Sequence, residues 1–403
     1  MARPAAGPLH GVRVVEAASF VAVPSAGMTL QQLGAEVIRV DPPGGGSDAG
    51  RWPLASTGAS LFWANLNKGK RSVTIDHRRP EGRELLIALA TAPGDDTGVF
   101  LDNMVGGRRL THAELADRRP DVIHVHVEGR RGGRPAVDYT VNAEVGVPLM
   151  TGSGEGLVPV NHVLPAWDLV TGMLAATCVS AALLGRRRTG QGAKVDVALA
   201  DVALAGVAEM GWLAEADEAG VARAALGNHM YGCFGVDFAT ADRRRVMVVA
   251  LTQGQWSALR DVTGTQRVFS ALEEALQADL DDEGDRFRLR ETIASILRPW
   301  FAARDLATLR GLLDGAKVLW APYRDMAEVV AQARADPGSV VAEVEQPGIG
   351  RMLGASQPWR WDDARQRPQP APLLSADTEA VLADTLGLDG REIGRLRAAG
   401  VVG

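Results

Sequence analysis

The first 130 residues alternate short β-branched runs with helix-forming segments, and this alternation limits the available folds more than any other feature. A helix is predicted at 24–33, with Gly34 at its C-terminal cap, and another begins near Pro80. Buried strands, rich in Val and Ile, are predicted at 12–16, 36–40, 72–76, 99–101 and 122–125. Strands separated by helices form a mostly parallel sheet with helices on both faces. The sequence therefore predicts an α/β fold.

The later part of the chain divides into segments of different character. A block at 165–216 holds an apolar helix over 169–184 and a strand over 194–199. From 222 to 320, aromatic residues, glycines and an acidic run appear, followed by helical patterns at 288–297 and 306–313. Pro-rich stretches near Pro337, Pro347 and 366–372 are interpreted as linkers or wrapping segments. A chain of 403 residues is too long for one ordinary core, so the 222–320 segment is interpreted as a smaller inserted domain.

The composition is that of an ordinary globular protein, with 46% hydrophobic and 23% charged residues. Acidic residues outnumber basic ones by 49 to 43, which argues against nucleic acid as a partner and leaves room for a local patch that binds a small anion. Cys178 and Cys233 match no metal or redox spacing, and no signal segment begins the sequence, so a cytoplasmic location is expected. The 169–184 run is short for a membrane span and is interpreted as a buried core helix, so no membrane partner is expected.

The common nucleotide and metal fingerprints are missing from the sequence. No G-x-G-x-x-G follows the first strand. Residues 69–72 resemble the end of a phosphate loop, but Ala64 stands where that loop needs Gly, and a strand follows instead of a helix. Residues 152–154 lack the flanking glycines of a nucleophile elbow. No H-E-x-x-H or paired Cys/His set occurs, so no catalytic metal is expected.

Basic side chains lie near the ends of three predicted strands. Arg39 ends the second strand, Lys70 lies in the turn 66–72, and Arg109 follows the strand at 99–101. Ligands of open α/β sheets bind outside the carboxyl ends of the strands. Three basic sites at that edge suit a ligand with several phosphates, whereas the alternative interpretation is a set of solvated surface charges.

Asp168 lies between Pro165 and a long apolar run, at or just inside the start of a helix. Asp is a preferred N-cap residue, and capping alone is one interpretation of its position. The other is catalytic, because a helix N-terminus favours an ionised carboxylate and offers N–H groups to an oxyanion. Such a carboxylate can attack an activated carbonyl.

Five blocks of sequence resemble the family III CoA-transferases and occur in that family's order. They are 11–16 (GVRVVE), 33–42 (LGAEVIRVDP), 67–73 (NKGKRSV), 167–172 (WDLVTG) and 188–192 (RTGQG). The resemblance implies a Rossmann-like large domain, formed by 1–215 and by a returning C-terminal segment at 325–403, with a smaller α+β domain at 222–320. It also implies an interlocked homodimer in which each ring-shaped chain threads the other.

The same resemblance assigns chemistry to individual positions. Asp168 attacks an acyl-CoA thioester, and an aspartyl-CoA thioester follows from the resulting mixed anhydride. The implied substrate is an acyl-CoA, and no cofactor beyond that CoA is needed. The residues expected along CoA are Arg39, Leu66, Asn67, Lys70, Met104 and Arg109.

The family includes racemases that add a His–Asp pair before the catalytic Asp. Val137 occupies the position of that His, which disfavours two-base proton transfer. Some intermolecular transferases carry Lys and Glu in this segment, where this chain has Val137 and Thr140. Their substrates therefore cannot be carried over.

A narrower resemblance points to members that move CoA between two carboxyls of one molecule. It covers 137–142, 148–152, 160–168 and 227–238, and it makes Asn161, His162 and Tyr231 candidates for contact with the substrate. Intermolecular transfer, racemisation and CoA binding without catalysis are the alternatives.

Overall fold

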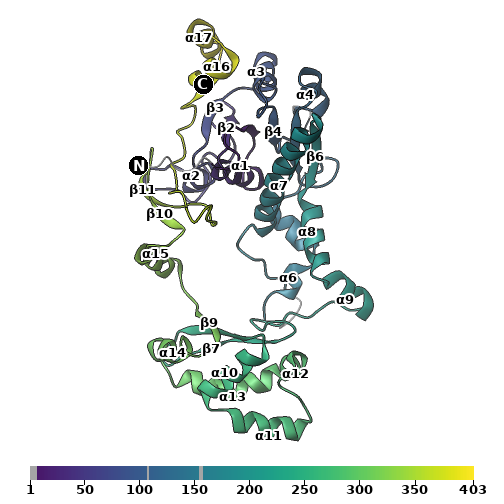
Figure 1. The fold of residues 1–403 in the computed structure, drawn as a ribbon, viewed down its shortest axis with the longest axis vertical. Coiled ribbons are helices and arrows are strands. Elements are labelled where there is room, and N and C mark those ends of the chain that lie inside the picture. Colours follow the sequence, from purple (N-terminus) through teal and green to yellow (C-terminus); the bar gives the residue numbers. More distant parts are fainter. Residues whose placement is uncertain (1–6, 107–108, 154–157) are drawn as a thin grey trace. The chain divides into compact units, whose positions relative to one another are not determined.

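The computed structural model describes residues 7–106, 109–153 and 158–403 (Figure 1). The chain divides into two compact units. Unit 1 comprises Met1–Val145, His162–Glu215 and Ala333–Gly403, and unit 2 comprises Gly146–Asn161 and Ala216–Gln332. The predicted limits did not separate the segment Gly146–Asn161 from the first domain, whereas its contacts assign it to unit 2.

Unit 1 is built on a six-stranded sheet with the order β3-β2-β1-β4-β5-β6, and every neighbouring pair is parallel. Its strands are β1 (Arg13–Ala17), β2 (Glu36–Asp41), β3 (Arg71–Thr74), β4 (Val99–Asp102), β5 (Ile123–Glu128) and β6 (Ala193–Ala198). The order reverses beside β1, as in doubly wound sheets, and this places the carboxyl ends of β1 and β4 at a switch point where such sheets bind ligands. The α/β prediction is confirmed, and each predicted strand lies within about two residues of an observed one.

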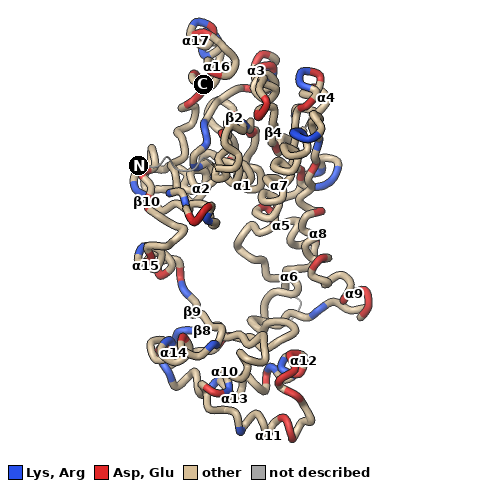
Figure 2. Tube along the Cα trace, in the orientation of Figure 1, with Lys and Arg blue, Asp and Glu red and all other residues tan. Residues whose placement is uncertain are grey.

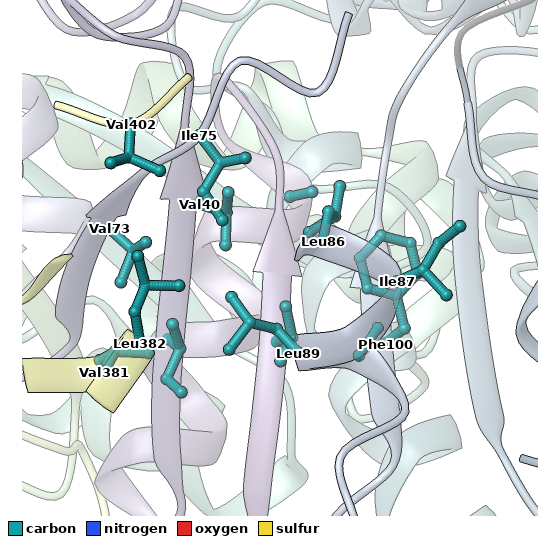
Figure 3. Packing of buried hydrophobic residues seen from close by; sticks show 14 of the residues in the cluster. Val40, Val73, Ile75, Leu86, Ile87, Leu89, Phe100, Val381, Leu382 and Val402 are labelled. Atoms are coloured by element: carbon teal, nitrogen blue, oxygen red, sulfur yellow. The ribbon is translucent and has the colours of Figure 1, made fainter. Parts of the chain in front are cut away.

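Helices cover both faces of this sheet because alternate strand residues point to opposite sides. On one face, Val14 and Leu101 pack against α1 (Ala22–Gln32) and α7 (Ala166–Thr189). On the other face, Val40 and Phe100 pack with α3 (Pro80–Ala90), α4 (His112–Arg118), α16 (Thr378–Leu386) and α17 (Gly390–Ala398). Figure 3 shows Val381 and Leu382 of α16 beside Val73, so the C-terminal segment completes the core of the sheet begun by the N-terminal one.

The rest of unit 1 surrounds the sheet. Its remaining helices are α2 (Leu61–Leu66), α5 (Asp138–Glu144) and α8 (Leu199–Glu209), with α9 (Trp212–Ala219) reaching the boundary between the units. The Pro-rich region interpreted as linkers contains an antiparallel hairpin, β10 (Val341–Gln346) with β11 (Gly350–Ala355), which the sequence interpretation missed. The helix α15 (Met326–Ala335) precedes it.

Unit 2 is an α+β unit around a three-stranded antiparallel sheet of the order β7-β8-β9, formed by Phe234–Ala239, Arg245–Ala250 and Leu319–Pro322. Its core is aromatic, with Phe238 and Phe301 stacked at 4.3 Å between ring centroids. Its helices are α6 (Val147–Met150), α10 (Gln253–Thr263), α11 (Gln266–Leu276), α12 (Glu283–Arg288), α13 (Arg290–Ala302) and α14 (Leu306–Leu313). The last of these matches the predicted helix at 306–313.

The helix α7 is long and apolar enough to cross a membrane by length and composition alone. In unit 1 it packs against α1 and β5, and its charged residues lie only in its first and last turns. Figure 2 shows the middle of α1 and of α7 without charged residues. The buried side of α7 therefore behaves as a core helix, as predicted, while its other side exposes Val170, Met173, Leu174 and Leu184.

The contact between α1 and α7 depends on Gly172. A Cβ at this position would lie 2.1 Å from Ser25 Oγ and 2.5 Å from the carbonyl oxygen of Ala22. Because one of these atoms is backbone, a side chain can be accommodated only if the two helices move apart.

We expect Gly172→Ala to lower the free energy of unfolding by about 2 kcal/mol through this forced separation. The matched control is Gly185→Ala in the same helix, where a Cβ meets no atom within 4 Å. That control should raise stability by up to about 1 kcal/mol through helix propensity. Urea unfolding of both variants measures the difference, and equal stability of the two would contradict the close-packing argument.

Candidate active site

Asp168 lies in the first turn of α7 and is not the N-cap, which is Pro165. The capping carboxylate comes from Asp138, the first residue of α5, which is 2% exposed. Asp138 Oδ2 accepts hydrogen bonds from the backbone N–H of Trp167 at 2.8 Å and from that of Asp168 at 3.2 Å. The interpretation of Asp168 as a simple helix cap is therefore wrong, and its side chain is left for another role.

The surroundings of Asp168 raise the pKa of its carboxyl to about 6. Burial contributes most, the negative charge of Asp138 adds to it, and the positive charge of Arg51 opposes both. This differs from the expectation that a helix N-terminus would favour the ionised form. The main reason is burial, and Asp138 in addition occupies two of the N–H groups that create the favourable field.

Arg51 belongs to an aromatic cluster in the loops that follow β1 and β2. Its guanidinium carbon lies 5.4 Å from the ring centroid of Phe20 and 5.3 Å from that of Phe62. Phe20 has a φ of 67°, and its N–H donates to Asp48 Oδ2 at 3.0 Å. A non-glycine residue with positive φ costs about 1–3 kcal/mol and commonly marks a functional loop. Sequence analysis missed Arg51 and Phe20, because neither follows a recognisable spacing.

A second connection joins α5 to the start of α7. Asn142 Oδ1 accepts a hydrogen bond from Trp167 Nε1 at 3.0 Å and lies 3.0 Å from His162 Nε2. His162 Nδ1 lies 2.5 Å from the carbonyl oxygen of Leu164. Of the predicted substrate residues, His162 is thus tied to the segment that carries Asp168.

The other two predicted substrate residues belong to unit 2. Asn161 is exposed and ends the segment Gly146–Asn161. Tyr231 contacts Phe287 edge-to-face at 4.9 Å between centroids, and the Arg223 guanidinium lies 3.4 Å from its ring centroid. Tyr231 is therefore held within a basic and aromatic environment of unit 2.

Three of the residues predicted along CoA form a buried ion network. Arg39 donates to Asp41 through Nε at 2.8 Å and Nη2 at 3.0 Å, to Asp48 at 3.1 Å and to Asn67 Oδ1 at 3.0 Å. Lys70 Nζ donates to both oxygens of Glu16 at 2.8 and 2.9 Å and to Asn67 Oδ1 at 2.9 Å. These side chains are not solvated surface charges, and their direct contact with CoA stays a prediction.

Burial lowers the pKa of Lys70 to about 8, although the charge of Glu16 opposes this effect. The pKa of Arg39 is raised despite its burial, because Asp41, Glu16 and Asp48 stabilise its charge. Sequence analysis missed these three carboxylates. A signal was present in Glu16, a charged residue that follows the buried Val14 and Val15 in β1.

Two more predicted CoA residues are anchored by Asp102 at the end of β4. Asp102 Oδ1 accepts from the backbone N–H of Met104 at 2.9 Å and lies 2.8 Å from His126 Nδ1. His124 Nε2 lies 2.7 Å from the other oxygen, and these two histidines lower the pKa of Asp102 despite its burial. Arg109 Nη1 in turn lies 3.2 Å from His126 Nε2. Leu66, the remaining predicted CoA residue, ends α2.

Asp102, His124 and His126 also have the spacing of a cation site within the described residues. The hydrogen bonds argue against one. Arg109 can only donate, so His126 Nε2 must accept and its Nδ1 must carry the proton that Asp102 receives. His126 then has no free lone pair for a metal. Asp102 therefore orients the imidazole of His126, and this imidazole accepts a hydrogen bond that fixes the guanidinium of Arg109.

Unit 1 thus combines a parallel sheet with a switch point, basic side chains near the strand ends and the carboxyl of Asp168 in the first turn of α7. The chain belongs to CoA-transferase family III, whose family model matches residues 9–378. It is therefore an enzyme of the CoA-transferase type.

Individual relatives and solved structures agree with this assignment. The chain is 49% identical over 403 residues to a 2-methylfumaryl-CoA isomerase from Chloroflexus aurantiacus, covering 98% of each chain. It is 29% identical to a succinyl-CoA:mesaconate CoA-transferase from Haloarcula marismortui, over 95% of this chain and 97% of that one. A crystal structure of a CaiB/BaiF family protein from Brucella suis matches with a TM-score of 0.75 and 25% identity, over 94% of this chain and 99% of that chain.

The raised pKa of Asp168 predicts the acid limb of the activity profile. Asp168 is predicted to be the nucleophile, and a nucleophile of this kind must be ionised, so kcat/KM should fall about tenfold per pH unit below pH 6 and level off above it. Steady-state rates between pH 4.5 and 8 check this, with circular dichroism at each pH as the control for folding. A limb centred near pH 4 would contradict the described environment of Asp168.

Proposed function

We propose that this enzyme transfers CoA within one molecule, between the two carboxyls of mesaconyl-CoA, through a covalent intermediate on Asp168. The observation that carries the proposal is a half-buried Asp168 with a pKa of about 6, in a chain that matches a 2-methylfumaryl-CoA isomerase over its whole length. Such a carboxylate is still about 90% ionised at pH 7 and more basic than an ordinary Asp, which suits a nucleophile.

The proposed reaction balances without an oxidant or a cofactor. Asp168 attacks the thioester carbonyl, which releases CoA thiolate and leaves a mixed anhydride. The thiolate attacks the aspartyl carbonyl of that anhydride, giving aspartyl-CoA and free mesaconate. The second carboxylate of mesaconate attacks aspartyl-CoA, and the released thiolate then attacks the mesaconyl carbonyl of the new anhydride. The products are the isomeric thioester and the original Asp168.

We propose separate roles for the other predicted residues. CoA lies along Arg39, Leu66, Asn67, Lys70, Met104 and Arg109. Asn161 and His162 hold the free carboxylate of the substrate, and Tyr231 is a further candidate for contact with the substrate. Anchoring of both Met104 and Arg109 through Asp102 supports the CoA assignment, since one rigid strand end then presents two contacts. The link from His162 to Asn142 supports the substrate assignment, because it ties an imidazole to the segment preceding Asp168.

Intermolecular transfer is the second candidate, favoured by the succinyl-CoA:mesaconate CoA-transferase relative. That reaction would use the same Asp168 and require an added acid as acceptor. Racemisation is disfavoured, because Val137 replaces the second base and offers no proton-transfer group.

Intramolecular transfer predicts turnover without an acceptor. Purified enzyme given mesaconyl-CoA esterified at one carboxyl should form the other isomer with no free acid present, as measured by chromatography of the CoA esters. Asp168→Asn should reduce the rate by at least about a thousandfold. Mass spectrometry after hydroxylamine treatment should find the modified carboxyl at Asp168 in the parent enzyme alone.

Strict dependence on an added acid would overturn intramolecular transfer and favour the second candidate. An adduct at Asp168, whether or not an added acid is required, would leave the covalent mechanism intact. Full activity of Asp168→Asn would exclude the mechanism itself.

We further propose that the enzyme acts in the cytoplasm as a homodimer in which the two chains interlock. The supporting observation is a set of exposed apolar side chains on α7, formed by Val170, Met173, Leu174 and Leu184. The helix α8 exposes a further one, Leu204. Contiguous apolar surface of this kind commonly marks a protein interface.

The dimer predicts a mass near twice 42.6 kDa by light scattering after size exclusion, with no dissociation on dilution to nanomolar concentration. Met173→Lys should weaken the dimer, because it would bury an unpaired charge. The control is Met326→Lys, at a methionine that is 80% exposed in α15. A monomeric parent protein would contradict the proposal.

A further inference from the structure

We propose that Asp138 is the positioning residue of the nucleophile, because its carboxylate fixes the main chain of Asp168 and sets a second negative charge against the Asp168 carboxyl. This inference rests on the proposed function, in which Asp168 is the nucleophile. It goes beyond that function by assigning the position of the nucleophile, and part of its basicity, to a residue on another helix.

The position of Asp138 is fixed from several sides. It begins α5, where neighbouring Val141 is fully buried against Leu199 and Ala203 of α8. Asn142, one turn further along α5, accepts from the indole N–H of Trp167. The two helices α5 and α7 are thus joined at two points, and the backbone of Asp168 cannot shift without breaking one of them.

The charge of Asp138 is only partly compensated. Oδ2 receives two backbone N–H groups, which favour its ionised form. Oδ1 is buried and has no hydrogen-bond donor within the part of the chain that the structure describes. A buried carboxylate oxygen without a protein donor acts strongly on neighbouring charges, because the surrounding medium has a low dielectric constant.

The negative charge of Asp138 acts on the carboxyl of Asp168. The charged groups that act on its carboxyl are Asp138 on α5, which raises its pKa, and Arg51 in the loop after β2, which lowers it. Asp138 accepts the two N–H groups at the start of α7, while burial and the charge of Asp138 make the carboxyl of Asp168 more basic than that of an ordinary Asp.

The test compares Asp138→Asn with Glu144→Gln. The first keeps an oxygen that can accept the N–H groups and removes the charge next to Asp168. The control removes the same charge at the exposed end of the same helix, where Glu144 pairs with Arg130. We expect the acid limb of kcat/KM to move down from pH 6 by about one unit in Asp138→Asn, with a lower kcat at pH 8, because a less basic carboxylate is a weaker nucleophile. Glu144→Gln should keep the parent profile.

The variant Asp138→Glu separates the effect of the charge from the effect of its position. It also keeps the proposal testable if Asp138→Asn does not fold. It keeps the charge and displaces the carboxylate, so the limb should stay near pH 6 while kcat drops. An unchanged limb in folded Asp138→Asn, or parent kinetics in Asp138→Glu, would overturn the positioning role. Hydroxylamine trapping separates the two proposals: no adduct at Asp168 in the parent enzyme contradicts the proposed function, whereas an adduct with an unmoved limb contradicts only the role of Asp138.

Discussion

The hydrogen bonds from the first turn of α7 to the Asp138 carboxylate are the interaction on which the candidate site depends. Unpaired N–H groups at a buried helix end cost about 1–3 kcal/mol each, and here a side chain from another helix satisfies two of them. The bonds also determine which way Asp168 faces, because its own N–H is one of the two donors. The same two hydrogen bonds therefore cap α7 and position Asp168, the proposed nucleophile.

The helix α7 transmits this local arrangement to the fold. It connects β5 to β6, and the absence of a side chain at Gly172 lets it lie directly on α1, which itself follows β1. Asp168 is consequently held in a fixed relation to the loop after β1, where Phe20 adopts its positive φ. A parallel sheet places such loops at one edge, so Asp168 at the start of α7, the proposed nucleophile, and the charged groups after β2 and β4 belong to one frame within unit 1.

Features set by residues close together in the chain, such as strands and helix starts, could be predicted from the sequence. Contacts between residues far apart in the chain could not. The strands of the sheet, Pro80 at the start of α3 and the place of Asp168 in α7 follow from local periodicity and helix signals. The hairpin β10–β11 lay hidden among prolines and glycines, which usually mark loops. Arg39 and Lys70 were placed at a basic edge because they lie near strand ends, with solvated surface charges as the alternative. Their carboxylate partners were missed, because Asp48 lies 9 positions from Arg39 and Glu16 lies 54 positions from Lys70. Asp138 was overlooked for the same reason, since its partners are 29 and 30 residues later.

The basic residues at the sheet edge differ in what they can offer a polyphosphate. Arg39 already gives two donors to Asp41, so a phosphate would have to displace a bidentate carboxylate from a buried site. Lys70 likewise gives its charge to Glu16. Arg109 instead contacts a neutral His126, and no carboxylate within the described ranges pairs with it. Its charge is oriented but not neutralised, because Asp102 holds the imidazole and not the guanidinium. Electrostatic attraction of an anionic ligand should therefore centre on Arg109, with Arg39 and Lys70 shaping the strand ends that face it.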